Sequence, residues 1–202
     1  MATAELTSVL PNAISDRRRL FTVADLPHFP TDLPSGPVDY ELDHGELIMM
    51  MRPTRRHSSL QARLAGELHA QGEKLGYGNV YTEVGIVLSR NPDRVVGPDV
   101  AFYAKSILPL VETSEGYLET MPSLAVEVRS KNDSRPYIDR KASDYLNAGV
   151  PLVWIVDADA NQLLVMQSGR PARILNIHDT LTAEDLIPSF QLAFADLFRE
   201  SS

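Results

Sequence analysis

The sequence contains no cysteine. Disulfide bridges and thiolate metal sites are therefore excluded, and the redox state of the compartment is left undetermined. The ligands of any metal ion would be mainly oxygen atoms. Oxygen ligands favour magnesium or manganese over zinc.

Long apolar runs are also missing. No segment approaches the ~18 apolar residues that a membrane-spanning helix needs. The first 20 residues have no apolar core segment, and Arg17, Arg18 and Arg19 follow the few apolar residues there, unlike the basic residues of a secretory signal. We therefore expect a cytoplasmic protein that does not bind a membrane.

Several functional motifs are absent from the sequence. It has no Walker loop, dinucleotide-binding fingerprint, nucleophile elbow or zinc-ligand spacing. Internal repeats, low-complexity tracts and a clear linker are missing as well. With 202 residues, the chain is long enough for one large domain or at most two small ones.

Basic residues are outnumbered, and the net charge is −8. This charge argues against broad, sequence-independent binding to nucleic acid, which depends on neutralising phosphates. Net charge does not describe how charges are distributed, so a local basic surface stays open. Arg52, Arg55 and Arg56 form one small basic cluster, either a solvated loop or a contact to a phosphate backbone.

The order of expected elements predicts one α/β domain with a mixed sheet over residues 37–202, preceded by a proline-rich arm over residues 1–36 with a helical turn near 23–26. A hairpin is expected around Gly45, and Gly76 and Gly149 mark the ends of two helices. The wholly apolar run 152–156 is typical of a central buried strand. The expected strands are 38–42, 46–50, 80–88, 95–103, 124–128, 152–156, 163–166 and 173–177, and the expected helices are 57–75 and 136–148, with a closing helical turn at 193–198.

Two carboxylates stand out because they lie in runs that otherwise read as buried strands. Asp99 falls within residues 95–103, and Glu127 falls within residues 124–128. Aspartate and glutamate are seldom fully buried unless they are paired or coordinate a cation. Asp99 alone could be a turn residue after Pro98. Glu127 could be neutralised by a salt bridge with Lys141 or Arg140, or both carboxylates could hold a divalent metal.

Other candidates allow two interpretations each. Lys141 lies at the edge of an apolar helix stripe, where its ammonium either reaches water or reaches the two carboxylates. Tyr145, one turn later, is a candidate for orienting it. Glu46 either faces solvent from its hairpin or belongs to the site. His57, near a helix start, is either a satisfied core or capping histidine or a ligand.

These residues, in this order, resemble the Uma-two family of endonucleases in the PD-(D/E)XK, restriction-endonuclease-like superfamily. The resemblance covers nearly the whole chain, including an opening hairpin, His57 at the head of the first helix and a stretch from Gly149 to Asp157. The matching motifs are Pro98-Asp99, Glu127-Val128-Arg129-Ser130, Lys141 with Tyr145 on a helix, and Gly149-Val150. The resemblance implies a mixed sheet with flanking helices, in which a strand pair carries metal-binding carboxylates.

Carried over by position, the resemblance implies that Asp99 and Glu127 are metal ligands and that the backbone carbonyl of Val128 is a third. Glu46 would match the acidic residue near the first helix of the superfamily. The superfamily pattern has lysine two residues after the glutamate, where this chain has Arg129. Lys141 resembles the migrated lysine of the family, and Arg129 could supply only charge, because arginine is not a base at neutral pH.

The resemblance therefore implies a Mg²⁺- or Mn²⁺-dependent endonuclease that hydrolyses nucleic acid, with DNA as the expected substrate and a homodimer as the expected assembly. A hypothesis of another class is a catalytically inactive nuclease-like fold that acts as a binding or scaffold module. In that case Asp99, Glu127 and Lys141 would form a structural ion-pair network.

Overall fold

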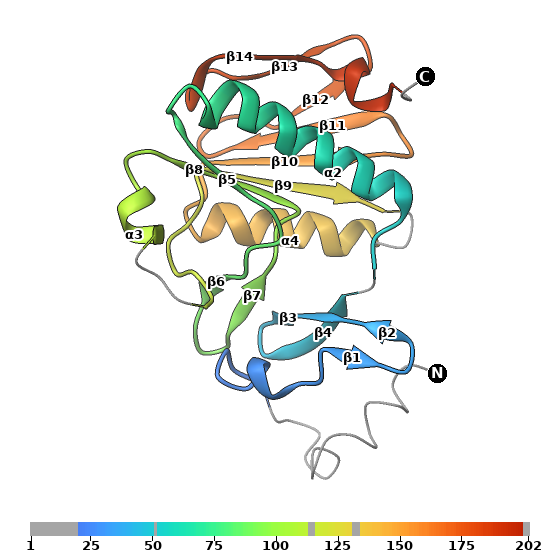
Figure 1. Ribbon diagram of the computed structural model, residues 1–202, viewed down its shortest axis with the longest axis vertical. Coiled ribbons are helices and arrows are strands. Elements are labelled where there is room, and N and C mark those ends of the chain that lie inside the picture. Colours follow the sequence, from blue (N-terminus) through green and yellow to red (C-terminus); the bar gives the residue numbers. More distant parts are fainter. Residues whose placement is uncertain (1–19, 51, 113–115, 131–133, 200–202) are drawn as a thin grey trace.

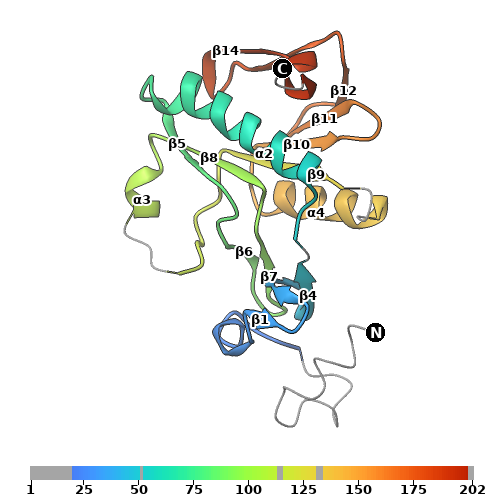
Figure 2. The same cartoon turned by 45° about the vertical axis from the view of Figure 1, so that its right-hand side comes forward.

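A six-stranded mixed sheet, called here the main sheet, forms the centre of the molecule (Figure 1). The computed structural model describes residues 20–50, 52–112, 116–130 and 134–199. Helix α2 (Arg55–Leu68) covers one face of this sheet and helix α4 (Arg135–Asn147) covers the other (Figures 1 and 2). In spatial order the strands are β12 (Arg173–Asn176), β11 (Gln162–Gln167), β10 (Leu152–Asp157), β9 (Leu124–Arg129), β8 (Val100–Ala104) and β5 (Gly78–Tyr81).

Strands β9 and β10 are the buried centre of the main sheet. They pair in parallel, whereas every other neighbouring pair of this sheet is antiparallel. Parallel strands covered on both faces read as continuous apolar runs, and residues 152–156 of β10 are all buried. Successive β9 residues face α2 and α4 in turn, so Glu127 lies on the α4 face together with Ala125.

Both helices follow from local signals in the sequence. Thr54 caps α2 by accepting a hydrogen bond from the N–H of His57, and Leu60, Leu64 and Leu68 pack onto the main sheet. The helix continues through a π-helical turn, η2 (His69–Glu73), before the chain turns at Gly76. Ser134 caps α4 in the same way.

A four-stranded sheet, called here the small sheet, lies below the main sheet in Figure 1. The expected hairpin is confirmed, with His44 and Gly45 at positive φ in its turn. Residues Leu26, Phe29 and Leu33 of the preceding segment are buried, and the predicted boundary at residue 36 stays a prediction. The small sheet has the order β4 (Glu46–Met50), β3 (Asp39–Asp43), β7 (Arg94–Val96) and β6 (Ile86–Ser89), and the segment before it holds η1 (Leu26–His28), β1 (Asp32–Leu33) and β2 (Gly36–Pro37).

Two runs predicted as single strands, 80–88 and 95–103, are each broken. In both, one part joins the main sheet and the other joins the small sheet. Glu83 has a φ of 54° in the first break, and Pro98 supplies no N–H in the second. The N–H of Glu83 donates to the carbonyl of Pro98 at 3.0 Å, which holds the two breaks side by side. Asp99 therefore lies at the junction of the two sheets, just before β8, rather than inside a strand.

The C-terminal part packs against α2 and completes its core. The expected strands 163–166 and 173–177 and the closing turn are confirmed as β11, β12 and the 3-10 helix η3 (Phe194–Phe198). Five elements were not predicted: β1 and β2 of the N-terminal segment, α3 (Leu108–Glu112), β13 (Thr180–Ala183) and β14 (Ile187–Ala193). Across the described parts of the chain, no helix combines the length and the apolarity that crossing a membrane requires.

Candidate active site

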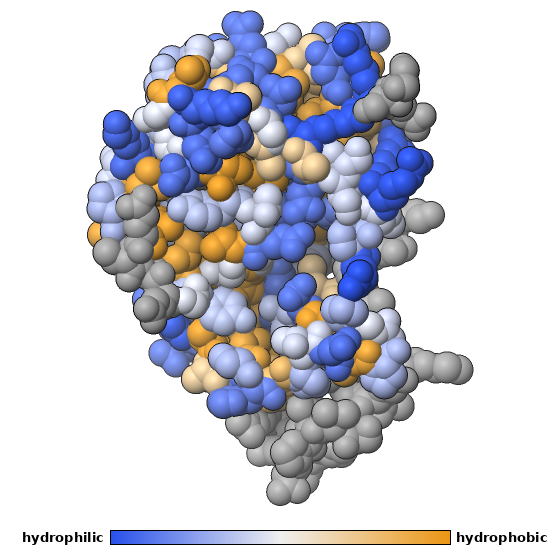
Figure 3. Space-filling model, viewed as in Figure 1, coloured by the Kyte–Doolittle hydropathy of each residue, from blue (hydrophilic) through white to orange (hydrophobic). Residues whose placement is uncertain are grey.

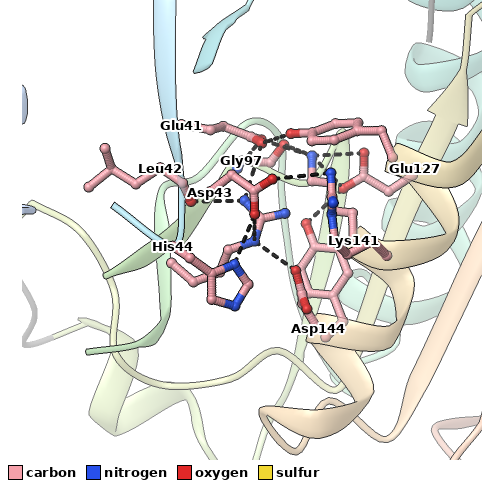
Figure 4. A network of polar contacts seen from close by, with 12 residues as sticks. Glu41, Leu42, Asp43, His44, Gly97, Glu127, Lys141 and Asp144 are labelled. Carbon is pink, nitrogen blue, oxygen red and sulfur yellow. Dashed lines mark hydrogen bonds and ion pairs between the residues drawn. The ribbon is translucent and has the colours of Figure 1, made fainter. Parts of the chain in front are cut away.

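A buried lysine joins the two sheets at the junction (Figure 4). The Nζ of Lys141, on α4, lies 2.8 Å from Glu41 Oε1 and 2.9 Å from Glu127 Oε1. All three side chains are almost fully buried, with at most 6% of each exposed. Buried charges need partners, so one ammonium serves a carboxylate from the small sheet and another from the main sheet.

Tyrosine hydroxyls donate further hydrogen bonds to the two glutamates. The Tyr145 hydroxyl donates to Glu127 at 2.7 Å, and the Tyr137 hydroxyl donates to Glu41 at 2.8 Å. Tyr137, Lys141 and Tyr145 are successive at four-residue spacing on α4, which places them on one face of the helix. The N–H of Gly97 also donates to Glu41. Tyr145 thus contacts Glu127, the proposed metal ligand.

The pKa values of the two glutamates differ because their surroundings differ. Burial raises the pKa of Glu127 to about 7; the charges of Asp99 and Glu41 also raise it, while Lys141 and Tyr145 lower it. Burial acts in the same direction on Glu41, but Lys141, the Gly97 N–H and Tyr137 outweigh it, so that its pKa lies below the usual value. Glu127 is therefore the carboxyl of the pair that takes up a proton more readily, and Glu41 stays ionised at neutral pH.

Lys141 stays charged at neutral pH. Burial alone would lower its pKa, but Glu127 and Glu41 outweigh burial and raise the pKa above the ordinary value. An ammonium that holds its proton so firmly cannot act as a general base. It can supply positive charge and hydrogen bonds to an oxyanion.

Asp99 is fixed by backbone and side-chain partners from both flanking elements. Its Oδ1 lies 2.8 Å from Nε2 of His57, and its Oδ2 accepts the N–H of Val128 at 2.6 Å. Gln61, one turn after His57 on α2, donates to the Asp99 carbonyl. Because the N–H and C=O of a strand residue point to the same side, the carbonyl of Val128 faces the edge of β9 that carries Asp99.

Glu46 and Arg129 lie apart from this network. Glu46 is exposed at the turn end of β4, where it lies opposite Asp43 in the strand register of the hairpin. Glu41, on β3, is the hairpin acid that reaches the site. Arg129 points to the same face as Glu127 but is paired with Asp157, with 2.7 Å between Nη1 and Oδ2.

Glu41 had no clear signal in the sequence. It alternates with Tyr40 and Leu42, a pattern that predicts a solvent-facing acid on a two-sided hairpin. Burial comes from α4, whose Tyr137 and Lys141 cover that face of β3. The sequence also gave no sign of Arg94, which is fully buried and donates to Asp144 at 2.7 Å.

The basic cluster near the start of α2 is exposed to solvent. It consists of Arg52, Arg55 and Arg56. Arg56 donates to Asn161 at 3.1 Å and lies 3.8 Å from Asp159, both in the β10–β11 turn. The cluster thus lies at the edge of the main sheet where β10 ends.

A second group of possible metal ligands consists of Asp43, His44 and Asp144, whose ligand atoms lie within 4.8 Å of one another. Two arginines already neutralise it: Arg94 contacts Asp144, and Arg140 lies 3.2 Å from Asp43. Lys141 neutralises Glu127 in the same way, so this contact with cations does not distinguish the two groups.

The donor set at Asp99 and Glu127 fits a magnesium or manganese ion. Both ligand groups are carboxylates, which magnesium and manganese prefer. The pKa of Glu127 is raised chiefly by burial and also by the charges of Asp99 and Glu41, and a bound cation would favour its ionised form. Within the described residues, no third carboxylate or imidazole joins these two within the 4.8 Å found for the other group. The Val128 carbonyl and water would supply the other ligands.

Comparison with known proteins places the chain in a family. A family model described as "Uma2: Putative restriction endonuclease" matches residues 26–195. The chain belongs to the Uma2 family. No curated protein matched the sequence.

A solved structure agrees with the Uma2 assignment at the level of the fold. It is a crystal structure from Anabaena variabilis ATCC 29413, described as a "putative nuclease belonging to DUF820". The two chains are 17% identical, with a TM-score of 0.75, and the match covers 88% of this chain and 97% of the other. The expected restriction-endonuclease-like core is thereby confirmed.

Proposed function

We propose that this protein is a divalent-metal-dependent endonuclease that hydrolyses phosphodiester bonds of DNA. The observation that carries the proposal is the pair of carboxylates at the β8–β9 edge with a lysine against one of them. Asp99 is bonded to the backbone of Val128, the residue after Glu127, and Glu127 contacts Lys141. Membership of the Uma2 family supports nuclease activity in general. The cytoplasmic location and the homodimer stay predictions.

Each residue has a distinct role in this proposal. Asp99, Glu127 and the carbonyl of Val128 would hold the metal, which when bound activates a water molecule and neutralises phosphate charge. His57 orients the Asp99 carboxylate, as partners of metal ligands commonly do. Lys141 stabilises negative charge that develops on the phosphoryl oxygens. Tyr145 holds the Glu127 carboxylate in place.

A second candidate function rests on a specific observation: Lys141 already contacts both glutamates, which closes the network as an ion-pair cluster. A nuclease-like fold with such a cluster could serve as a binding or scaffold module without catalysis. The net charge of −8 also favours this alternative, because it opposes binding to phosphates.

Calorimetric titration with MnCl₂ and MgCl₂, paired with a plasmid-cleavage assay, separates the two functions. We expect detectable binding of Mn²⁺ and divalent-dependent nicking of the plasmid. Binding should weaken strongly in Glu127→Gln, because that variant lacks one carboxylate ligand. If wild-type protein binds neither ion and leaves the plasmid intact, the scaffold function stands.

The affinity for Mn²⁺ should depend on pH through Glu127. Below about pH 7 this carboxyl is protonated, and a metal must displace the proton, so the affinity should fall about tenfold per pH unit. Above that pH it should level off. Tyr145→Phe removes a hydrogen bond that lowers the pKa of Glu127, so the break in the profile should move to higher pH. An unchanged break in Tyr145→Phe would count against this role for the tyrosine.

A further inference from the structure

The edge of the main sheet next to the candidate site carries a cavity lined by arginines. It lies on the α4 face, between the ends of β9 and β10 and the first turns of α4. Its polar lining includes Arg129, Arg135, Asp139 and Asp157, and residues of β11 and β12 complete the cavity. In Figure 1 this edge is on the right, where β9 ends between the starts of α2 and α4, and Figure 3 shows hydrophilic side chains gathered there.

From this geometry we infer that Arg129 and Arg135 form a subsite for the nucleic-acid phosphate next to the scissile one. The inference rests on the proposed function, because it assumes that the substrate is a phosphodiester strand. Arg129 stands where the superfamily pattern has lysine. In this inference it binds the substrate and takes no part in the chemical step.

The register of β9 sets the spacing. Arg129 follows Glu127 by two residues, so the two side chains project from the same face with Cα atoms about 6.6 Å apart. Neighbouring phosphates of a nucleic-acid strand are separated by a comparable length. A strand whose scissile phosphate lay at the proposed metal site of Asp99 and Glu127 would therefore present the next phosphate near Arg129.

The guanidinium of Arg129 retains capacity for another partner. Among the described residues it bonds to Asp157 through Nη1, and its Nε is buried without a hydrogen-bond partner. Arginine has five donors in a fork that matches phosphate oxygens. The Arg129 side chain is 23% exposed, so it can be reached from solvent.

Arg135 supplies a second cation, whose present ion pair can be broken at a small cost in stability. It pairs with Asp139 one turn later on α4, at 3.1 Å, and both side chains are more than half exposed. Exposed ion pairs of this kind contribute little to stability, so Arg135 can exchange Asp139 for a phosphate. By contrast, Asp157 is 14% exposed and stays beside Arg129 as a competitor for the anion.

The chemistry of the lining favours the nucleic-acid backbone over a base. Two arginines line the cavity, and the guanidinium fork matches the oxygens of a phosphate. Binding here should therefore be independent of sequence and sensitive to salt.

The test measures the binding of a fluorescein-labelled DNA oligonucleotide, single-stranded and duplex, by anisotropy in EDTA over a range of salt concentrations. Arg129→Gln should weaken binding about tenfold and reduce the salt slope by about one contact, roughly 0.9 for duplex and 0.7 for single strands. Arg129→Lys should keep most of the salt dependence of binding, because lysine carries the same charge. Asp157→Asn, which breaks the same ion pair, should strengthen binding because it removes the competing carboxylate.

The matched control is Arg170→Gln, which changes the net charge equally at an exposed arginine after the far end of β11. It should leave the slope unchanged. The subsite is refuted if Arg170→Gln weakens binding as much as Arg129→Gln, or if Asp157→Asn weakens it too, since net charge or a folding defect then explains both. Thermal unfolding of Arg129→Gln and Asp157→Asn measures their shared loss of the ion pair.

Cleavage kinetics separate this inference from the proposed function. If Arg129 binds substrate, Arg129→Gln should raise KM and leave kcat nearly constant. Wild-type cleavage with unchanged KM and salt slope in Arg129→Gln would overturn the subsite and leave the nuclease intact. The expected binding pattern without cleavage in Mn²⁺ would overturn the nuclease and leave Arg129 as a contact to a nucleic-acid phosphate. If the wild-type protein binds neither oligonucleotide, both fail.

Discussion

Replacing Asp99 or Glu127 by alanine should lower divalent-dependent DNA cleavage by about a thousandfold or more. A bound metal supplies several kcal/mol of charge stabilisation to the transition state, and each 1.36 kcal/mol is a factor of ten in rate. The measurement is the initial rate of plasmid nicking at saturating MnCl₂. Full activity in both variants would refute the site.

Two controls make this loss interpretable. Glu127→Ala should remain folded, because Lys141 keeps Glu41 as a partner, and circular dichroism with thermal unfolding checks this. Glu46→Ala removes an exposed carboxylate at the hairpin turn, so the geometry favours near wild-type activity. A loss in Glu46→Ala equal to that in Glu127→Ala would restore Glu46 as the acidic residue of the site, as expected from the sequence.

Replacing Lys141 by methionine should destabilise the protein by about 3–5 kcal/mol. Removing one member of a buried ion-pair network leaves uncompensated charge in the interior, and here two carboxylates would share the loss. The free energy of unfolding from urea titration measures the effect. Activity should also fall, because the charge against Glu127 is gone.

The matched control is Arg140→Met, the neighbouring cation on α4. Arg140 is 55% exposed and pairs with Asp43, so its loss should cost no more than about 1 kcal/mol. Adding Glu127→Gln to Lys141→Met should recover part of the stability, since one of the two unpaired charges disappears. Equal costs for Lys141→Met and Arg140→Met would show that the lysine is not needed to neutralise the glutamates.

Residues whose position depends on one element and its immediate packing could be predicted from the sequence. Glu127 interrupts an apolar strand, and Lys141 lies on the apolar edge of the following helix, so their meeting on one sheet face follows from regular geometry. Asp99 is a candidate from the sequence, and the structure places it directly before β8, as the interpretation of a turn residue after Pro98 predicts. The division of residues 95–103 between two sheets was not predicted.

What depends on the docking of the two sheets could not be predicted. Whether Glu41 or Glu46 faces the site is decided by where α4 lies over β3, and no local periodicity encodes that position. The pairing of Arg94 with Asp144 likewise joins residues 50 positions apart on different elements. Arg129 was predicted on the correct face, but its partner Asp157 comes from the neighbouring parallel strand.

The placement of Glu41 on the small sheet and Lys141 on the helix of the main sheet has a consequence for cooperativity. Local opening that lifts the small sheet would separate this ion pair and expose both charges to water. Partial unfolding of the hairpin should therefore cost nearly as much as global unfolding, and native-state hydrogen exchange should show β3 amides as protected as those of β9. The pair makes one folding unit of two sheets that share few strand contacts.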